Sequence, residues 1–166
     1  MPFLITKRLV VGATFFGGLL AGVTANRALV QLPAWGRTGL TDWARFANQE
    51  NLGLGPLFYS SVGLAALLFT VAAAIASRFD RAVHEARRFP IYSAAVVAIL
   101  WAGITRFVLV PAMSHVNAAI NNPTELKQAF LTVTRWSAVN DALHVLTFVL
   151  TLWGFVEIFS RAPGSE

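Results

Sequence analysis

The stretch RWSAVNDALHVLTFVLTLWGFV, residues 135–156, joins a polar segment to one of the most apolar parts of the chain. Its first ten residues carry a cation, an indole, Asn140, Asp141 and His144, and the remainder is almost entirely apolar. About 20 such residues in a helix span the hydrocarbon core of a bilayer, which is about 30 Å thick. The stretch is therefore typical of a membrane-spanning helix that takes polar side chains into the bilayer with it.

Four apolar runs of this length occur in the chain, at about residues 9–32, 55–77, 90–112 and 141–160. Of the 166 residues 56% are hydrophobic and 13% are charged, and a typical soluble domain has about 25% charged residues. Backbone groups in lipid must be hydrogen-bonded within their own segment, so each run should be a helix. The sequence predicts an all-α fold, with one membrane domain over residues 1–166 built as a four-transmembrane-helix bundle.

Composition also excludes several classes of site. The chain has no cysteine, which rules out disulfides, zinc thiolate sites, iron–sulfur clusters and thiol nucleophiles. Its net charge of +5 does not indicate nucleic-acid binding, because the cations lie in short loops between apolar runs. The first run follows Lys7 and Arg8 and shows no convincing cleavage site, so we interpret it as a retained transmembrane helix rather than a signal peptide.

The cations in the loops predict how the chain is oriented, since lysine and arginine are enriched on the cytoplasmic side. With four spans, one side of the membrane receives Lys7, Arg8, Arg78, Arg81, Arg87, Arg88 and Arg161. The other side receives Arg37, Arg45, Lys127 and Arg135. Seven cations against four predict that both termini and the second loop are cytoplasmic, in a multi-pass protein of a bacterial inner membrane.

Both outer loops are predicted to contain helices. In GLTDWARFANQEN, residues 39–51, apolar side chains recur at the spacing of a short amphipathic helix: Leu40, Trp43 and Phe46 or Ala47. We expect this helix to lie on the membrane surface or to cap the bundle, with Trp43 as an interfacial aromatic residue. The second loop, PTELKQAFLTVTRW at residues 123–136, opens with helix-start residues. It predicts a helix that is either separate from the fourth span or continuous with it.

The polar residues near the spans share one end of the predicted bundle. Polar groups in a membrane are functional candidates by default, and we place one site in the outer half from Asn26, Arg27, Arg106, His115, Asn117, Trp136, Asn140 and His144. Trp136, Asn140 and His144 are spaced four apart, which predicts a shared inward face. Simpler interpretations remain: Arg27 and Arg106 as interfacial anchors, and Asp141 as a residue near a helix N-terminus.

The site chemistry has two versions. Intramembrane histidines commonly hold haem iron, so the first version binds haem b through His144, with His115 as alternative or second axial ligand. Arg27 and Arg106 would then pair with the propionates, and Asn26 and Asn117 would complete the cofactor site. The second version has no cofactor, and His144 is a general base assisted by Asn140 and Trp136. Two histidines without cysteine make a poor zinc site.

Three motifs resemble the anthrone oxygenase-like family of small membrane proteins over most of the chain. They are ANRALVQLPAW (25–35), VPAMSHVNAAI (110–120) and the W-x3-N-x3-H pattern of residues 136–144. The matching polar positions are Asn26, Asn117, Trp136, Asn140 and His144. The resemblance implies an integral membrane oxygenase that converts a flat, hydrophobic, anthrone-like substrate with dioxygen.

A second class of function stays open at this point. The same histidines would suit a haem-binding electron carrier, and the small size would suit a membrane assembly protein. Two histidine ligands would occupy both axial positions of the iron and favour electron transfer, whereas one histidine would leave an axial position to which dioxygen can bind. The expected partners are the lipid bilayer, a small aromatic substrate and dioxygen. A homodimer is compatible with the sequence.

Overall fold

The computed structural model describes residues 2–52, 54–81 and 83–160, and within these ranges every regular element is a helix. The elements are α1 (Pro2–Asn26), the π-helical turn η1 (Arg27–Gln31), α2 (Leu32–Thr38), α3 (Leu40–Leu52), α4 (Gly55–Phe79), α5 (Glu85–Ile104), the π-helical turn η2 (Thr105–Leu109), α6 (Val110–Ala118) and α7 (Pro123–Phe159). Four helices are long and apolar enough to cross a membrane: Phe3–Thr38, Leu57–Phe79, Arg87–Val116 and Pro123–Phe159. The predicted all-α four-helix bundle is confirmed.

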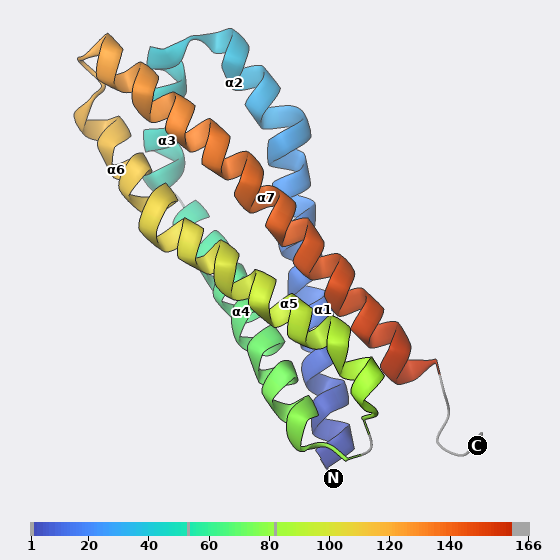
Figure 1. The fold of residues 1–166 in the computed structure, drawn as a ribbon. Coiled ribbons are helices and arrows are strands. Elements are labelled where there is room, and N and C mark those ends of the chain that lie inside the picture. Colours follow the sequence, from blue (N-terminus) through green and yellow to red (C-terminus); the bar gives the residue numbers. More distant parts are fainter. Residues whose placement is uncertain (1, 53, 82, 161–166) are drawn as a thin grey trace.

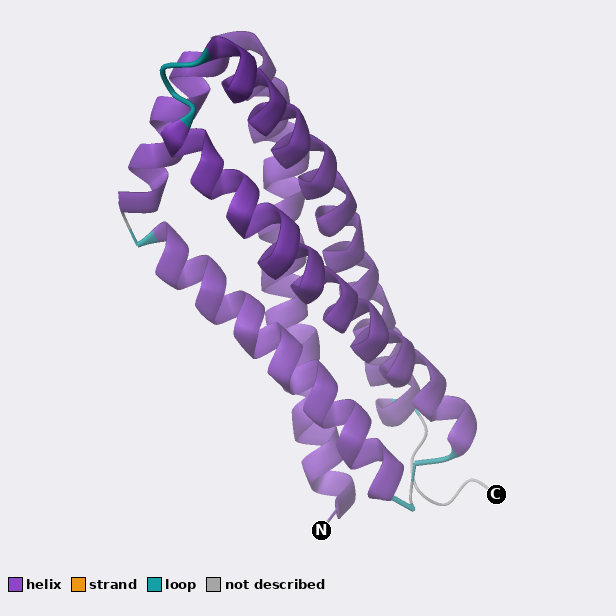
Figure 2. Cartoon of the chain, turned by 60° about the vertical axis from the view of Figure 1, so that its left-hand side comes forward, coloured by secondary structure: helices purple, strands orange, loops and turns teal. Residues whose placement is uncertain are grey.

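The long helices run side by side along one bundle (Figure 1). The start of α1, the turn between α4 and α5 and the end of α7 lie together at one end, which we call the N-terminal end. The other end, which we call the cap end, holds α2, α3, α6 and the start of α7. Figure 2 shows that short loops join the helices. The arrangement fits the even number of spans on which the predicted orientation depends.

The fourth span begins much earlier than the predicted residue 141. Helix α7 is continuous from Pro123 to Phe159, so the helix predicted in the second outer loop and the fourth span are one element. Its start is fixed by Asn122, whose side-chain oxygen accepts hydrogen bonds from the backbone N–H of Thr124 and Glu125 at 3.2 and 3.4 Å. This cap satisfies two of the N–H groups that have no partner within the helix.

Two prolines widen helices instead of ending them. Proline commonly bends or ends a helix, but both helices continue beyond Pro33 and Pro111. Proline has no N–H and its ring collides with the carbonyl four residues earlier. Each proline lies just after a π-helical turn, in which the N–H of Leu32 or Val110 donates to a carbonyl five residues back. The wider turn relieves the collision, so the chain stays helical.

Small residues allow the long helices to pack closely. A methyl group at Gly154 of α7 would lie 2.9 Å from Cγ1 of Ile91 on α5, so the Ile91 side chain packs against the α7 backbone where only hydrogen fits. Buried alanines line α4 and α5, among them Ala66 and Ala73 on α4 and Ala94 and Ala98 on α5. Large apolar side chains face outward instead, including Phe15, Leu64, Ile99 and Val149. Close packing inside with large apolar groups outside is the pattern expected in lipid.

Helix α3 caps the bundle, as one of the two predicted placements required. Trp43 and Ala44 are buried against α6 and α7, in a cluster that includes Val116, Leu126 and Val133. The Trp43 ring is 2% exposed and meets Phe130 edge-on at 4.8 Å between ring centroids. The expectation that Trp43 is an interfacial aromatic residue is therefore wrong. The indole fills the space that opens where the long helices diverge.

Candidate functional site

Helix α7 carries a buried polar stripe along its inner face. Its members recur at intervals of three and four residues, which keeps them on one side of a helix. They are Ser137, Asn140, Asp141, His144, Thr147 and Thr151. The threonines donate to backbone carbonyls of the preceding turn, so their hydroxyl groups are satisfied within α7. Asn140, Asp141 and His144 instead contact other helices. Together with their partners Thr105, Arg27 and Trp101 they form the polar cluster that we take as the candidate site.

Asp141 forms an ion pair with Arg27 across the bundle. Nη2 of Arg27 donates to Oδ1 of Asp141, and Nε donates to Oδ2 at 3.3 Å. The aspartate side chain is 5% exposed and the arginine side chain 32%. Arg27 is the first residue of η1, and Asp141 lies far from the start of α7, so the interpretation of Asp141 as a residue near a helix N-terminus is wrong. A bidentate ion pair of this kind stabilises a carboxylate that would be costly to bury alone.

Asn140, the neighbour of Asp141, contacts the other π-helical turn. Its Nδ2 donates to Oγ1 of Thr105 at 3.1 Å and lies 3.4 Å from Nε2 of His144. Thr105 is the first residue of η2, as Arg27 is the first residue of η1. Asn140 and Asp141 are therefore held from two sides. Thr105, the first residue of η2, contacts Asn140, and Arg27, the first residue of η1, contacts Asp141. The turns position the site, because a tighter helix would aim both side chains elsewhere.

His144 packs against an indole and has one ring nitrogen without a partner. The rings of His144 and Trp101 meet edge-on, with 4.6 Å between centroids and 74° between planes. Three polar atoms of the cluster are buried without any hydrogen-bond partner: Nδ1 of His144, Oδ1 of Asn140 and Nε1 of Trp101. Leaving such an atom unpaired costs about 1–3 kcal/mol. A polar group from water or from a ligand would pair with these atoms.

Three of the predicted site residues are not buried with this cluster. Asn26, Arg106 and Trp136 are exposed on the outside of the bundle, and the predicted inward face of Trp136 is wrong. Steps of four residues turn a helix by about 40° beyond a full circle, so Trp136 lies about 80° around α7 from His144. Ser137 occupies the inward position instead. The side chain of Asn117 lies outside the described residues.

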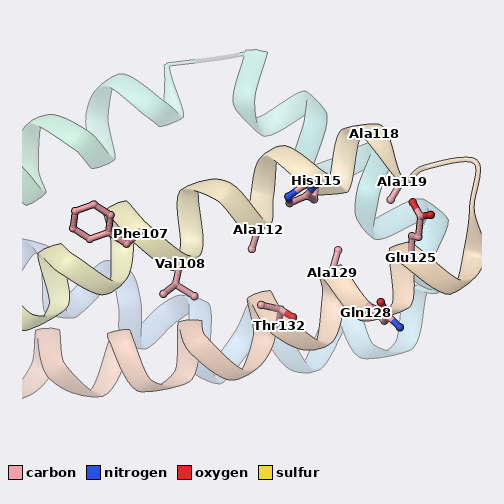
Figure 3. A pocket seen from close by; sticks show the side chains of 10 residues that line it. All are labelled: Phe107, Val108, Ala112, His115, Ala118, Ala119, Glu125, Gln128, Ala129 and Thr132. Carbon is pink, nitrogen blue, oxygen red and sulfur yellow. The ribbon is translucent and has the colours of Figure 1, made fainter.

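His115 lies in a different place from His144. It is exposed and lines a cavity of about 490 Å³ between α6 and α7, which Figure 3 shows from close by. The cavity also contains the polar side chains of Glu125, Gln128 and Thr132. His144 follows Thr132 by 12 residues, about 18 Å along the helix. This separation argues against a single iron held by both histidines.

The haem version also meets an obstacle at His144 itself. Iron needs an open ring nitrogen, but His144 is 6% exposed, with Nε2 beside Asn140 and Nδ1 enclosed. The ring packs edge-on against Trp101, so a porphyrin at His144 would require the two rings to separate. Within the described part of the chain, no three or more histidine and acidic side chains are grouped to hold a metal ion. The cluster as packed does not fit a haem plane.

Sequence reasoning missed two members of the cluster, Thr105 and Trp101. Thr105 had a signal in the sequence: Arg27 precedes Pro33 by six residues, and Thr105 precedes Pro111 by six. Both segments contain V-x-x-P-A, as VQLPA at residues 30–34 and VLVPA at residues 108–112. Aligning them pairs Arg27 with Thr105. Trp101 had no signal of this kind, because an indole in an apolar run is typical of core packing.

Comparison with known proteins gives no relative: no family model, no curated protein and no solved structure matches this chain.

Proposed function

We propose that this protein is a membrane-embedded oxygenase of the anthrone oxygenase-like kind, which works without haem at the cluster of Asn140, Asp141 and His144. The observation that carries the proposal is the set of three buried, unpaired polar atoms on Trp101, Asn140 and His144. They adjoin the ion pair of Asp141 with Arg27. An anthrone is smaller than haem, but the helices must still separate at Trp101 and His144 to admit it, because both side chains are buried. Its polar edge would then pair with the three unpaired atoms.

His144 is suited to take a proton from such a substrate. When Nδ2 of Asn140 faces Nε2 of His144, Nε2 holds the lone pair and Nδ1 the hydrogen. A half-turn of the amide brings Oδ1 to Nε2, which moves the hydrogen there and gives the enclosed Nδ1 a free lone pair. The Trp101 N–H then remains as a donor for the enolate oxygen that forms when the substrate loses its proton. The orientation of the Asn140 amide thus decides whether Nδ1 of His144 presents a hydrogen or a lone pair to the substrate.

The reaction balances without a further reductant. The methylene group of an anthrone gives one proton to Nδ1 of His144, and the resulting carbanion passes its electron pair to dioxygen. With the proton returned, the new C–O bond belongs to a hydroperoxide. Loss of the second C–H proton with cleavage of the O–O bond releases water and leaves a carbonyl. One methylene group and one dioxygen therefore give one quinone carbonyl and one water, with carbon oxidised and dioxygen reduced.

The test is turnover of anthrone by the purified protein in lipid nanodiscs. We expect oxygen consumption and quinone absorbance at a one-to-one ratio, with no Soret band after expression with ample haem. His144→Ala should lower the rate by about 100-fold or more, the usual contribution of a general base. His115→Ala is the matched control and should retain the rate.

Two results would overturn the proposal. The first is a Soret band that disappears in His144→Ala, which would point to a haem protein and to the electron-carrier alternative. The second is a rate of quinone formation no higher than that of empty nanodiscs. Thermal unfolding of each variant separates loss of chemistry from loss of fold.

A further inference from the structure

A second cavity lies at the N-terminal end of the bundle, far from the polar cluster. Its volume is about 420 Å³, and it is lined by Arg78 at the end of α4 and by Glu85, Arg88 and Tyr92 on α5. Two guanidinium groups face one carboxylate there, so the lining carries a net positive charge. Arg81 and Arg87 in the adjoining segment add to the positive potential. An anion is the ligand that such a lining favours.

Arg88 is held in position before any ligand arrives. Its Nε donates to the carbonyl of Val83 and its Nη2 to the carbonyl of Asp80, each at 3.0 Å. The turn between α4 and α5 therefore wraps around this guanidinium and fixes it. A cation fixed in advance loses little conformational entropy when an anion binds. The start of α5, whose N-cap residue His84 makes no side-chain cap, adds the positive end of a helix dipole.

The cavity lies at the level where a membrane has its headgroups. Arg78 is in the last turn of the span Leu57–Phe79, and Arg88 is in the first turn of the span Arg87–Val116. Their neighbours Phe79 and Phe89 are 74% and 63% exposed. Exposed aromatic rings beside paired arginines would lie along acyl chains while the arginines reach the phosphate. A soluble anion would gain nothing from these rings.

We propose that this cavity binds the phosphate of an anionic phospholipid between Arg78 and Arg88, with the hydroxyl group of Tyr92 as a further donor. The inference is independent of the proposed oxygenase function, because the lining residues lie at the end of α4 and the start of α5 and include none of Asn140, Asp141 and His144. Arginine pairs bind phosphate through parallel N–H bonds, which makes them more specific than a diffuse positive surface. The bound lipid would link α4 to α5.

Native mass spectrometry of the delipidated protein tests the site with phosphatidylglycerol, phosphatidylcholine and inorganic phosphate as separate probes. We expect phosphatidylglycerol to bind and Arg78→Gln to weaken it by at least about fivefold, the effect of one cation near a membrane surface. Tyr92→Phe should weaken it by a smaller factor. Arg81→Gln is the matched control, since it removes the same charge from an exposed residue outside the lining.

Three outcomes would overturn the site. Equal loss in Arg78→Gln and Arg81→Gln would mean that only net charge matters. Equal binding of phosphatidylcholine would mean that the site does not select an anionic headgroup. Binding of inorganic phosphate as tight as that of the lipid would identify a soluble anion instead. Arg78 is exposed and makes no contact that the fold depends on within the described residues, so its substitution leaves a folded protein to measure.

Discussion

Asp141 shows how a single buried charge is tolerated in this bundle. Its carboxylate is 5% exposed and is compensated by Arg27 through two hydrogen bonds. Removing one partner of a buried pair leaves the other uncompensated, which costs about 3–5 kcal/mol, whereas replacing both by apolar groups costs far less. The pair therefore serves the site more than it serves the stability of the fold.

We expect Arg27→Met to lower the free energy of unfolding by about 3–5 kcal/mol, measured by denaturation in detergent micelles. The double variant Arg27→Met with Asp141→Leu should recover most of that loss. Arg106→Met is the matched control, because Arg106 is exposed on the third long helix, and it should be close to neutral. A double variant as unstable as the single one would contradict the compensation.

At the scale of elements, the two π-helical turns decide where the site forms. Each turn precedes a proline and begins with a residue that contacts α7: Arg27 before Pro33, and Thr105 before Pro111. Proline removes the normal hydrogen bond and forces the wider turn. The same local feature therefore occurs on both helices that flank Asn140 and Asp141.

Pro33→Ala should let the first long helix close to a regular α-helix and rotate Arg27 away from Asp141. The measurable consequence is the coupling energy between Arg27 and Asp141 in a double-mutant cycle. We expect it to fall by about half or more in the Pro33→Ala background. An unchanged coupling energy would show that the proline does not position Arg27.

The contact of α5 with α7 gives a second prediction at this scale. Gly154→Ala places a methyl group 2.9 Å from Cγ1 of Ile91, and overpacking of this kind costs about 1–3 kcal/mol. Gly22→Ala is the control, since a methyl group there meets nothing within 4 Å and alanine favours a helix over glycine. Thermal unfolding should separate the two variants, and a loss in Gly22→Ala as large as in Gly154→Ala would contradict the packing argument.

At the scale of the whole molecule, we propose that the N-terminal end of the bundle faces the cytoplasm, since the loops there carry more lysine and arginine. The chain has no natural cysteine, so single cysteines report orientation cleanly. A cysteine at the exposed residue Thr41 on α3 should react with a membrane-impermeant maleimide in intact cells. A cysteine at Ser165, which lies outside the described residues, should react only after lysis. The reverse pattern would invert the orientation.

The four-helix architecture was predictable from the sequence because it depends on composition and length. A long apolar run in lipid must form a helix, because its backbone groups have to be hydrogen-bonded within the segment. This requirement does not depend on what the helix contacts. The same is true of α3, whose apolar spacing predicted a helix at residues 39–51, close to its bounds of Leu40–Leu52. The inward position of Asn140 and His144, which are both buried, was also predictable, since polar groups in such a run need partners.

Only the tertiary structure decided which polar residues form the site. Spacing predicted that Trp136 shares a face with His144, but the inward face of a long helix follows intervals of three and four, and Ser137 takes that place. Nothing in the run around Trp101 showed that its indole would meet the imidazole of His144. Taken alone, Pro33 and Pro111 favour a bend or an end of the helix, because proline removes a backbone hydrogen bond. Packing against α7 keeps both helices intact through π-helical turns, and contacts between distant segments are set by such packing rather than by local sequence.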